Sequence, residues 1–91
     1  MIQRRVLVSG RVQGVFFRAA TLEEAQKYPS LCGFVRNRDD GTVEALFAGD
    51  EKEVESMISW CKKGPPRARV SELKIKEEEF NSQLKKFYID R

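Results

Sequence analysis

The stretch VSGRVQGVFFR, residues 8–18, connects a strand pattern to a helix pattern. Valines recur at alternate positions in residues 4–10, which predicts a strand. Residues 18–28 carry apolar side chains near helical spacing, which predicts a helix that Pro29 ends. The two glycines therefore lie where a strand gives way to a helix.

Such a strand, glycine-containing turn and helix in succession can hold an anion. Main-chain N–H groups converge at a turn of this kind, and the N-terminus of the helix adds a partial positive charge. Arg18 would lie in the first turn of the helix, where its guanidinium matches phosphate oxygens. The stretch is not the GxxxxGK[ST] loop of nucleotide-binding proteins. A β-bulge or hairpin with Arg18 as a solvated charge fits the same residues.

Four further strand patterns and one helix pattern follow. We expect the strands at residues 31–37, 42–49, 70–76 and 84–90, and the helix at residues 50–63. DDG at 39–41 is a hairpin-turn signal, Asp50 and Glu53 have capping-box spacing, and the glutamates at 77–79 indicate a solvated turn. This order predicts a ferredoxin-like α+β fold (βαββαβ), with an antiparallel sheet of four to five strands and both helices on one face.

Length and composition limit the class of protein. The 91 residues predict one domain spanning residues 1–91, and 17 basic against 14 acidic residues give a net charge of +3. No apolar run could span a membrane, and the N-terminus does not resemble a signal peptide, so we expect a cytoplasmic protein. The absence of histidine excludes Ser-His and Cys-His nucleophiles. Cys32 and Cys61 lack metal-site spacing, so we expect no bound metal. They could form one disulfide, but nothing suggests secretion, so we expect reduced thiols.

Three motifs resemble those of the acylphosphatase family. GRVQGVFFR at 10–18 resembles its signature loop, G-x-V-Q-G-V-x-F/Y-R, and GFVRNRDDGTVE at 33–44 resembles its second signature. GPPRARV at 64–70 resembles a third motif, and the closing FYIDR is similar to the family's ending. The resemblance covers nearly the whole chain in the family's order. It departs at KYPSLC, residues 27–32, where a proline enters a link that lies away from the signature loop.

The resemblance implies an enzyme that hydrolyses the carboxyl–phosphate bond of acyl phosphates without a metal or cofactor. It implies that Arg18 binds the phosphate, that Asn37 orients the attacking water, and that the loop main chain surrounds the phosphate. The loop residues are Gln13, Gly14, Val15, Phe16, Phe17 and Arg18. Inorganic phosphate would be both product and inhibitor, and we expect a monomer with no membrane or nucleic-acid partner.

The residue types present are compatible with this chemistry. The leaving carboxylate has a conjugate acid with a pKa of about 4, so it departs at neutral pH without a general acid. Phosphoryl transfer through a loose transition state needs positioning and charge stabilisation more than a strong base. Asn37 cannot act as a base, but its amide can hold a water. Strand alternation places Asn37 and Arg36 on opposite faces of the sheet. An asparagine at this position could also cap the following turn.

Two other interpretations remain. A ferredoxin-like sheet could bind an anion or RNA without catalysis, but no K/R-G-F/Y-G/A-F-V strand motif is present. The chain could also be a subunit or regulatory part of a larger phosphate-handling enzyme, although its length favours an enzyme that acts alone. Turnover of an acyl phosphate separates hydrolysis from binding alone.

Overall fold

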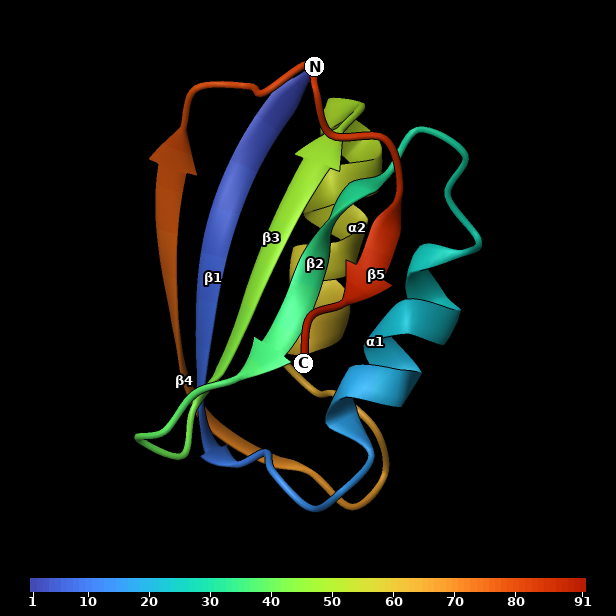
Figure 1. Ribbon diagram of the computed structural model, residues 1–91. Helices are drawn as coiled ribbons and strands as arrows, with labels where there is room; N and C mark the ends of the chain where they lie inside the picture. The colour runs from blue at the N-terminus through green and yellow to red at the C-terminus, as the bar shows by residue number, and fades with distance from the viewer.

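A computed structural model describes all residues of the chain, Met1–Arg91. One five-stranded sheet carries two helices on a single face (Figure 1). The strands are β1 (Ile2–Arg11), β2 (Cys32–Asn37), β3 (Val43–Gly49), β4 (Arg69–Glu78) and β5 (Phe87–Ile89), and the helices are α1 (Phe17–Ala25) and α2 (Glu51–Cys61). The strand order β4-β1-β3-β2-β5 confirms the ferredoxin-like fold predicted from the sequence.

The prediction of an antiparallel sheet holds for four strands and is wrong for the fifth. β1 pairs antiparallel with β3 and β4, and β2 pairs antiparallel with β3. β5 instead runs parallel to β2, with Gly33 opposite Phe87 and Val35 opposite Ile89. After β4 the chain crosses from one edge of the sheet to the other, and it therefore enters β5 in the direction of β2 (Figure 1).

The core lies between the sheet and the two helices. β1 and β3 supply fully buried side chains such as Val6, Val8 and Phe47 to this layer. α2 covers them with Val54, Met57 and Cys61, and α1 adds Phe17, Thr21 and Ala25. Each set has the spacing of one helical face. Cys61 and Cys32 form no disulfide, and burial raises the pKa of the Cys61 thiol to about 12.

Helix α1 ends three residues earlier than its apolar spacing predicts. Its last turn tightens, because the main-chain N–H groups of Lys27 and Tyr28 bond to carbonyls only three residues back. Pro29 disfavours a helical conformation for Tyr28, which directly precedes it. The proline that distinguishes this chain from the family pattern therefore shortens the helix at the end remote from the signature loop.

Helix α2 starts with only half of the predicted capping box. Asp50 accepts a hydrogen bond from the main-chain N–H of Lys52 over 3.0 Å, as an N-cap residue should. Glu53 does not return to Asp50 but accepts from both the main-chain N–H and the hydroxyl of Ser30. The Ser30 hydroxyl oxygen then accepts from the Asp50 N–H over 2.9 Å. The cap thus ties α2 to the segment that precedes β2.

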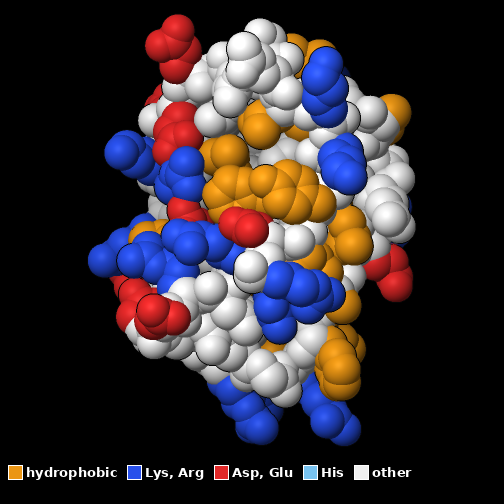
Figure 2. Space-filling model, in the orientation of Figure 1, with side chains coloured by type: hydrophobic (Ala, Val, Ile, Leu, Met, Phe, Trp, Pro, Cys, Tyr) orange, Lys and Arg blue, Asp and Glu red, His pale blue; other side chains and the backbone are white.

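The sheet face away from the helices carries an ion-pair network. Glu78, predicted in a turn, belongs instead to β4 and pairs with Arg5 on β1. Arg5 and Arg36 both bond to Glu44 on β3, whose side chain is only 6% exposed. Burial opposes ionisation of Glu44, but the hydrogen bonds from both arginines outweigh it and lower its pKa. Figure 2 shows this face, with charges of both signs around an apolar band.

Candidate active site

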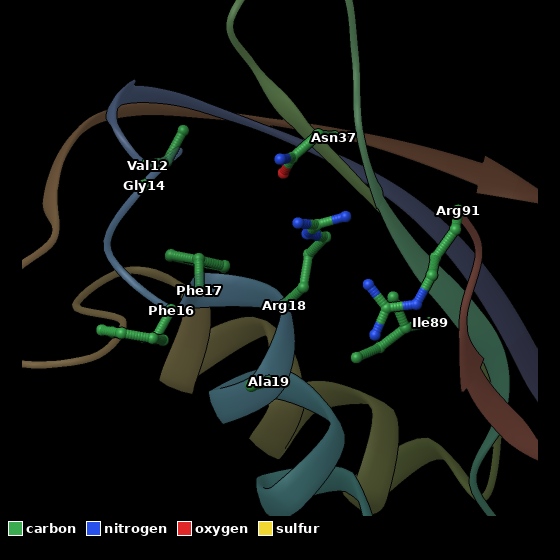
Figure 3. A pocket seen from close by; sticks show the side chains of 9 residues that line it. All are labelled: Val12, Gly14, Phe16, Phe17, Arg18, Ala19, Asn37, Ile89 and Arg91. Carbon is green, nitrogen blue, oxygen red and sulfur yellow. The ribbon is translucent and has the colours of Figure 1, made fainter.

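A cavity of about 400 Å³ opens where the loop after β1, the start of α1 and the end of β2 meet (Figure 3). Its lining residues are Val12, Gly14, Phe16, Phe17, Arg18, Ala19, Asn37, Ile89 and Arg91. Arg18 and Asn37 come from different elements and project into the same space. The fold therefore brings together the two side chains that the sequence predicts as catalytic.

The loop before α1 has an unusual main-chain conformation. Gly14 has φ +74° and Phe16 has φ +64°, both in the left-handed region. For a phenylalanine this conformation costs about 1–3 kcal/mol, and such strain is frequently found at functional sites. The Phe16 side chain itself is 75% exposed, so no burial of this ring in the core compensates for the strain. The strained conformation is therefore a property of the loop main chain, the part of the loop that is predicted to bind phosphate.

The N-terminus of α1 has no side-chain cap. Phe16 occupies the N-cap position without a side-chain hydrogen bond, and the first turn contains no acidic residue. The first N–H groups of a helix have no partner within the helix, and they carry a partial positive charge. Here they border the cavity beside the Arg18 guanidinium. This end of the helix is suited to an anion.

The side chain of Gln13 does not lie at the cavity, where a simple phosphate-binding loop would place it. Its Nε2 amide donates to the main-chain oxygen of Arg38 over 2.8 Å and to that of Thr42 over 2.9 Å. Neither Gln13 nor the buried Val15 lines the cavity. Any contribution of these two residues to phosphate binding is therefore limited to their main chain, and the side chain of Gln13 fastens the loop to the β2–β3 turn.

Arg18 and Asn37 keep their polar side-chain atoms free. Neither side chain makes a hydrogen bond or an ion pair with another residue, in contrast to Arg5 and Arg36. Their groups are thus available to a ligand. Asn37 faces the cavity while Arg36 bonds to Glu44 on the opposite sheet face, as strand alternation predicts.

Asn37 does not cap the turn that follows it. That role belongs to Asp40, which accepts from the Thr42 hydroxyl over 2.6 Å and from the Thr42 N–H over 3.0 Å. The hydroxyl bond is the main cause of the lowered pKa of Asp40. The alternative interpretation of Asn37 as a turn residue is therefore wrong, and its amide is left for the cavity.

Gly64, the first residue of the third motif, packs against Phe17, which lines the cavity. A Cβ atom on Gly64 would lie 2.6 Å from Cε2 of Phe17, so only glycine permits this packing. Trp60 also packs against Phe17, with ring centroids 5.7 Å apart. Phe17 is thereby fixed in the core, and it holds the neighbouring Arg18 at the cavity.

Four residues that line the cavity were not predicted from the sequence. They are Val12, Ala19, Ile89 and Arg91. Alternation along FYIDR places Ile89 and Arg91 on one side of an extended segment. This pattern could have predicted that the two side chains face the same space. The sequence does not show that this segment borders the loop around Arg18, because that depends on the parallel pairing of β5.

No group of three or more His, Cys, Asp or Glu side chains is placed to hold a metal ion. None of the helices combines the length and the apolar character needed to cross a membrane.

Comparisons with known proteins agree on one family. The family model described as Acylphosphatase matches residues 4–89. The acylphosphatase of Syntrophobacter fumaroxidans is 48% identical over 84 residues, which cover 92% of this chain and 86% of that protein. That of Aeropyrum pernix is 47% identical over 90 residues, covering 98% and 88%. The crystal structure of acylphosphatase from Bacillus subtilis matches with a TM-score of 0.93 and 40% identity over the full length of both chains. This chain belongs to the acylphosphatase family.

Proposed function

We propose that the cavity around Arg18 and Asn37 is where this member of the acylphosphatase family hydrolyses acyl phosphates. One observation carries the assignment of the site. The free Arg18 guanidinium, the free Asn37 amide and the uncapped N-terminus of α1 all border one cavity. A cation, a helix N-terminus and a neutral water-binding group are the parts that hydrolysis of an activated phosphate requires.

Binding of the phosphoryl group is the first step. Main-chain N–H groups of residues 13–18 surround the phosphoryl oxygens, and Arg18 donates to them through its guanidinium. The positive end of α1 adds to the attraction. The main-chain donors are held in place before the substrate arrives, so they stabilise charge that builds up during the reaction without reorganising.

The chemical step is an attack by water on phosphorus. Asn37 holds the water by hydrogen bonds in line with the bond to be broken. As the water oxygen bonds to phosphorus, the bond between phosphorus and the carboxyl oxygen breaks, and its electron pair leaves with the carboxylate. The proton of the water passes to a phosphoryl oxygen. The products are a carboxylate and inorganic phosphate, and no general acid is needed because the leaving group is a weak base.

Binding of RNA without catalysis is not favoured by the open sheet face. RNA-binding sheets stack bases on aromatic side chains of their strands. The open face does carry one aromatic pair, Phe34 and Tyr88, but it lies on β2 and β5, while the central strands β1 and β3 present the ion pair of Arg5 with Glu44. We propose a cytoplasmic monomer whose partners are small acyl phosphates, and we expect size-exclusion chromatography to give the mass of one chain.

Hydrolysis of benzoyl phosphate at neutral pH tests the proposed activity. With a chelator present, we expect turnover well above the spontaneous rate and competitive inhibition by inorganic phosphate. Spontaneous hydrolysis only, together with measurable binding of phosphate, would leave the cavity as an anion-binding site and overturn the proposal.

A further inference from the structure

The cavity extends beyond Arg18 to a second arginine. Arg91 and Ile89 form the wall that lies across the cavity from the loop before α1 (Figure 3). A volume of about 400 Å³ falls within the range of small-molecule sites rather than single-ion sites. The mechanism proposed above uses the side where Arg18 and the helix N-terminus lie, and it assigns nothing to the Arg91 side.

The pairing of β5 with β2 brings Arg91 to the cavity that Asn37 also lines. Val35 lies opposite Ile89 in the parallel register, and the Asp90 N–H continues the pairing with a bond of 2.9 Å to the Val35 carbonyl. Asn37 and Arg91 each lie two residues beyond this pair, and both line the cavity. Since residues two apart share a face of the sheet, Arg91 faces the cavity together with Ile89.

Arg91 has no partner among the other residues. The six ion pairs involve Arg4, Arg5, Arg36, Arg38 and Lys27, but neither Arg18 nor Arg91. Two unpaired guanidinium groups thus border one cavity whose lining residues include no Asp or Glu side chain. A ligand with two separated negative groups can neutralise both.

We propose that Arg91 binds a carboxylate on the acyl part of the substrate and so makes the chain selective for acyl phosphates that carry one. This inference rests on the proposed function. With the phosphoryl group at Arg18, the acyl part extends across Ile89, which offers it an apolar surface. A carboxylate beyond that surface reaches the guanidinium of Arg91, whose planar donors match its two oxygens.

Two rigid substrates separate this role from phosphate binding. Benzoyl phosphate and its 3- or 4-carboxylated derivatives share the reacting group and differ in the second anion. We expect the unmodified chain to prefer a carboxylated substrate by about tenfold in kcat/KM, the effect of one charge-assisted hydrogen bond. Arg91→Gln should abolish the preference through KM and leave kcat on benzoyl phosphate within about twofold. Arg91→Lys should restore part of it.

The control removes a charge elsewhere. Lys85 is exposed, makes no ion pair, and precedes β5, whereas the cavity lies at the other end of that strand. Lys85→Gln should keep the full preference. An equal loss on both substrates in Arg91→Gln would show that Arg91 acts on the phosphoryl group or the fold, and unchanged kinetics would show no contact; either overturns the proposal.

Binding without turnover keeps the two proposals distinguishable. Benzoylphosphonate and its carboxylated derivatives lack the bond that is hydrolysed, so calorimetry can compare their dissociation constants. Preference for a carboxylated phosphonate that depends on Arg91, in a chain that hydrolyses neither benzoyl phosphate nor its carboxylated derivatives, would contradict the proposed function alone. Equal affinity for all compounds would contradict the role of Arg91.

Discussion

The Nε2 amide of Gln13 donates a hydrogen bond of 2.9 Å to the main-chain oxygen of Thr42. A second bond of 2.8 Å reaches the oxygen of Arg38. The loop that leads into Arg18 is thereby tied to the turn that follows Asn37. The relative position of the two free polar side chains in the cavity therefore depends on a residue that does not line it.

Replacement of Gln13 tests this connection. In Gln13→Ala both hydrogen bonds are lost, and we expect a loss of about 1–2 kcal/mol in stability, the range for such bonds. We also expect kcat/KM for benzoyl phosphate to fall about tenfold or more, because small misplacements of catalytic groups are costly. Gln83→Ala is the control, since the Gln83 side chain makes no hydrogen bond. Unchanged kcat/KM in Gln13→Ala would show that the link does not position the site.

Gly14 and Gly41 both have a positive φ, so their alanine variants can be compared directly. Gly14 has φ +74° and Gly41 has φ +91°, and a Cβ atom on either would meet nothing within 4 Å. Alanine at either position therefore introduces left-handed strain of about 1–2 kcal/mol without a clash. Only Gly14 lines the cavity. We expect similar losses in thermal stability, but weakened inhibition by inorganic phosphate in Gly14→Ala alone. Equal phosphate inhibition in the two variants would argue against a binding role for the loop main chain.

Removal of the Asn37 amide should separate binding from chemistry. Because Asn37 positions the water rather than the phosphate, Asn37→Ala should lower kcat by about 10²–10³, as found for single stabilising donors in other enzymes. The inhibition constant of inorganic phosphate should stay within about threefold. A variant that loses phosphate inhibition and kcat in parallel would place Asn37 among the phosphate ligands instead.

Much of this fold follows from local patterns. The alternation around Val6 and Val8 and the helical spacing of Val54, Met57 and Cys61 identify their elements, because burial on one face demands those periods. Arg18 and Asn37 line one cavity, and their roles there stay predictions that rest on a family resemblance.

Other features depend on contacts between distant segments. Glu53 leaves the expected capping box because Ser30 offers it two donors, and no local pattern places Ser30 there. The direction of β5 follows from a crossover between the two edges of the sheet, which short strand patterns do not encode. For the same reason Arg91 at the cavity was not predicted.

The ion pairs of the open sheet face make stability depend on pH. The pKa values of Glu44 and Glu78 are lowered in the folded chain. Their contribution is therefore fully present above the unfolded value of about 4.3, and it is lost as pH falls through the folded values. We expect urea-unfolding midpoints to fall steadily from pH 5 to pH 3.

The Glu44→Gln variant tests whether this loss of stability at low pH comes from the ion-pair network. Glu44→Gln should cost about 1–3 kcal/mol at pH 7, because Arg36 loses its carboxylate partner and Arg5 keeps only Glu78, and it should flatten the decline below pH 5. Glu55→Gln is the control, since Glu55 is exposed on α2 and makes no ion pair. The same decline in Glu44→Gln as in the unmodified chain would place the acid sensitivity elsewhere.

The rate of benzoyl phosphate hydrolysis by Arg18→Gln tests the central claim most directly. Arg18 is the only cation that the proposed mechanism places on the phosphoryl group. The account predicts a fall in kcat/KM of about 10³ or more and a loss of phosphate inhibition, with thermal unfolding unchanged and Lys85→Gln unaffected. Turnover by a folded Arg18→Gln within about threefold of the unmodified chain would contradict the account.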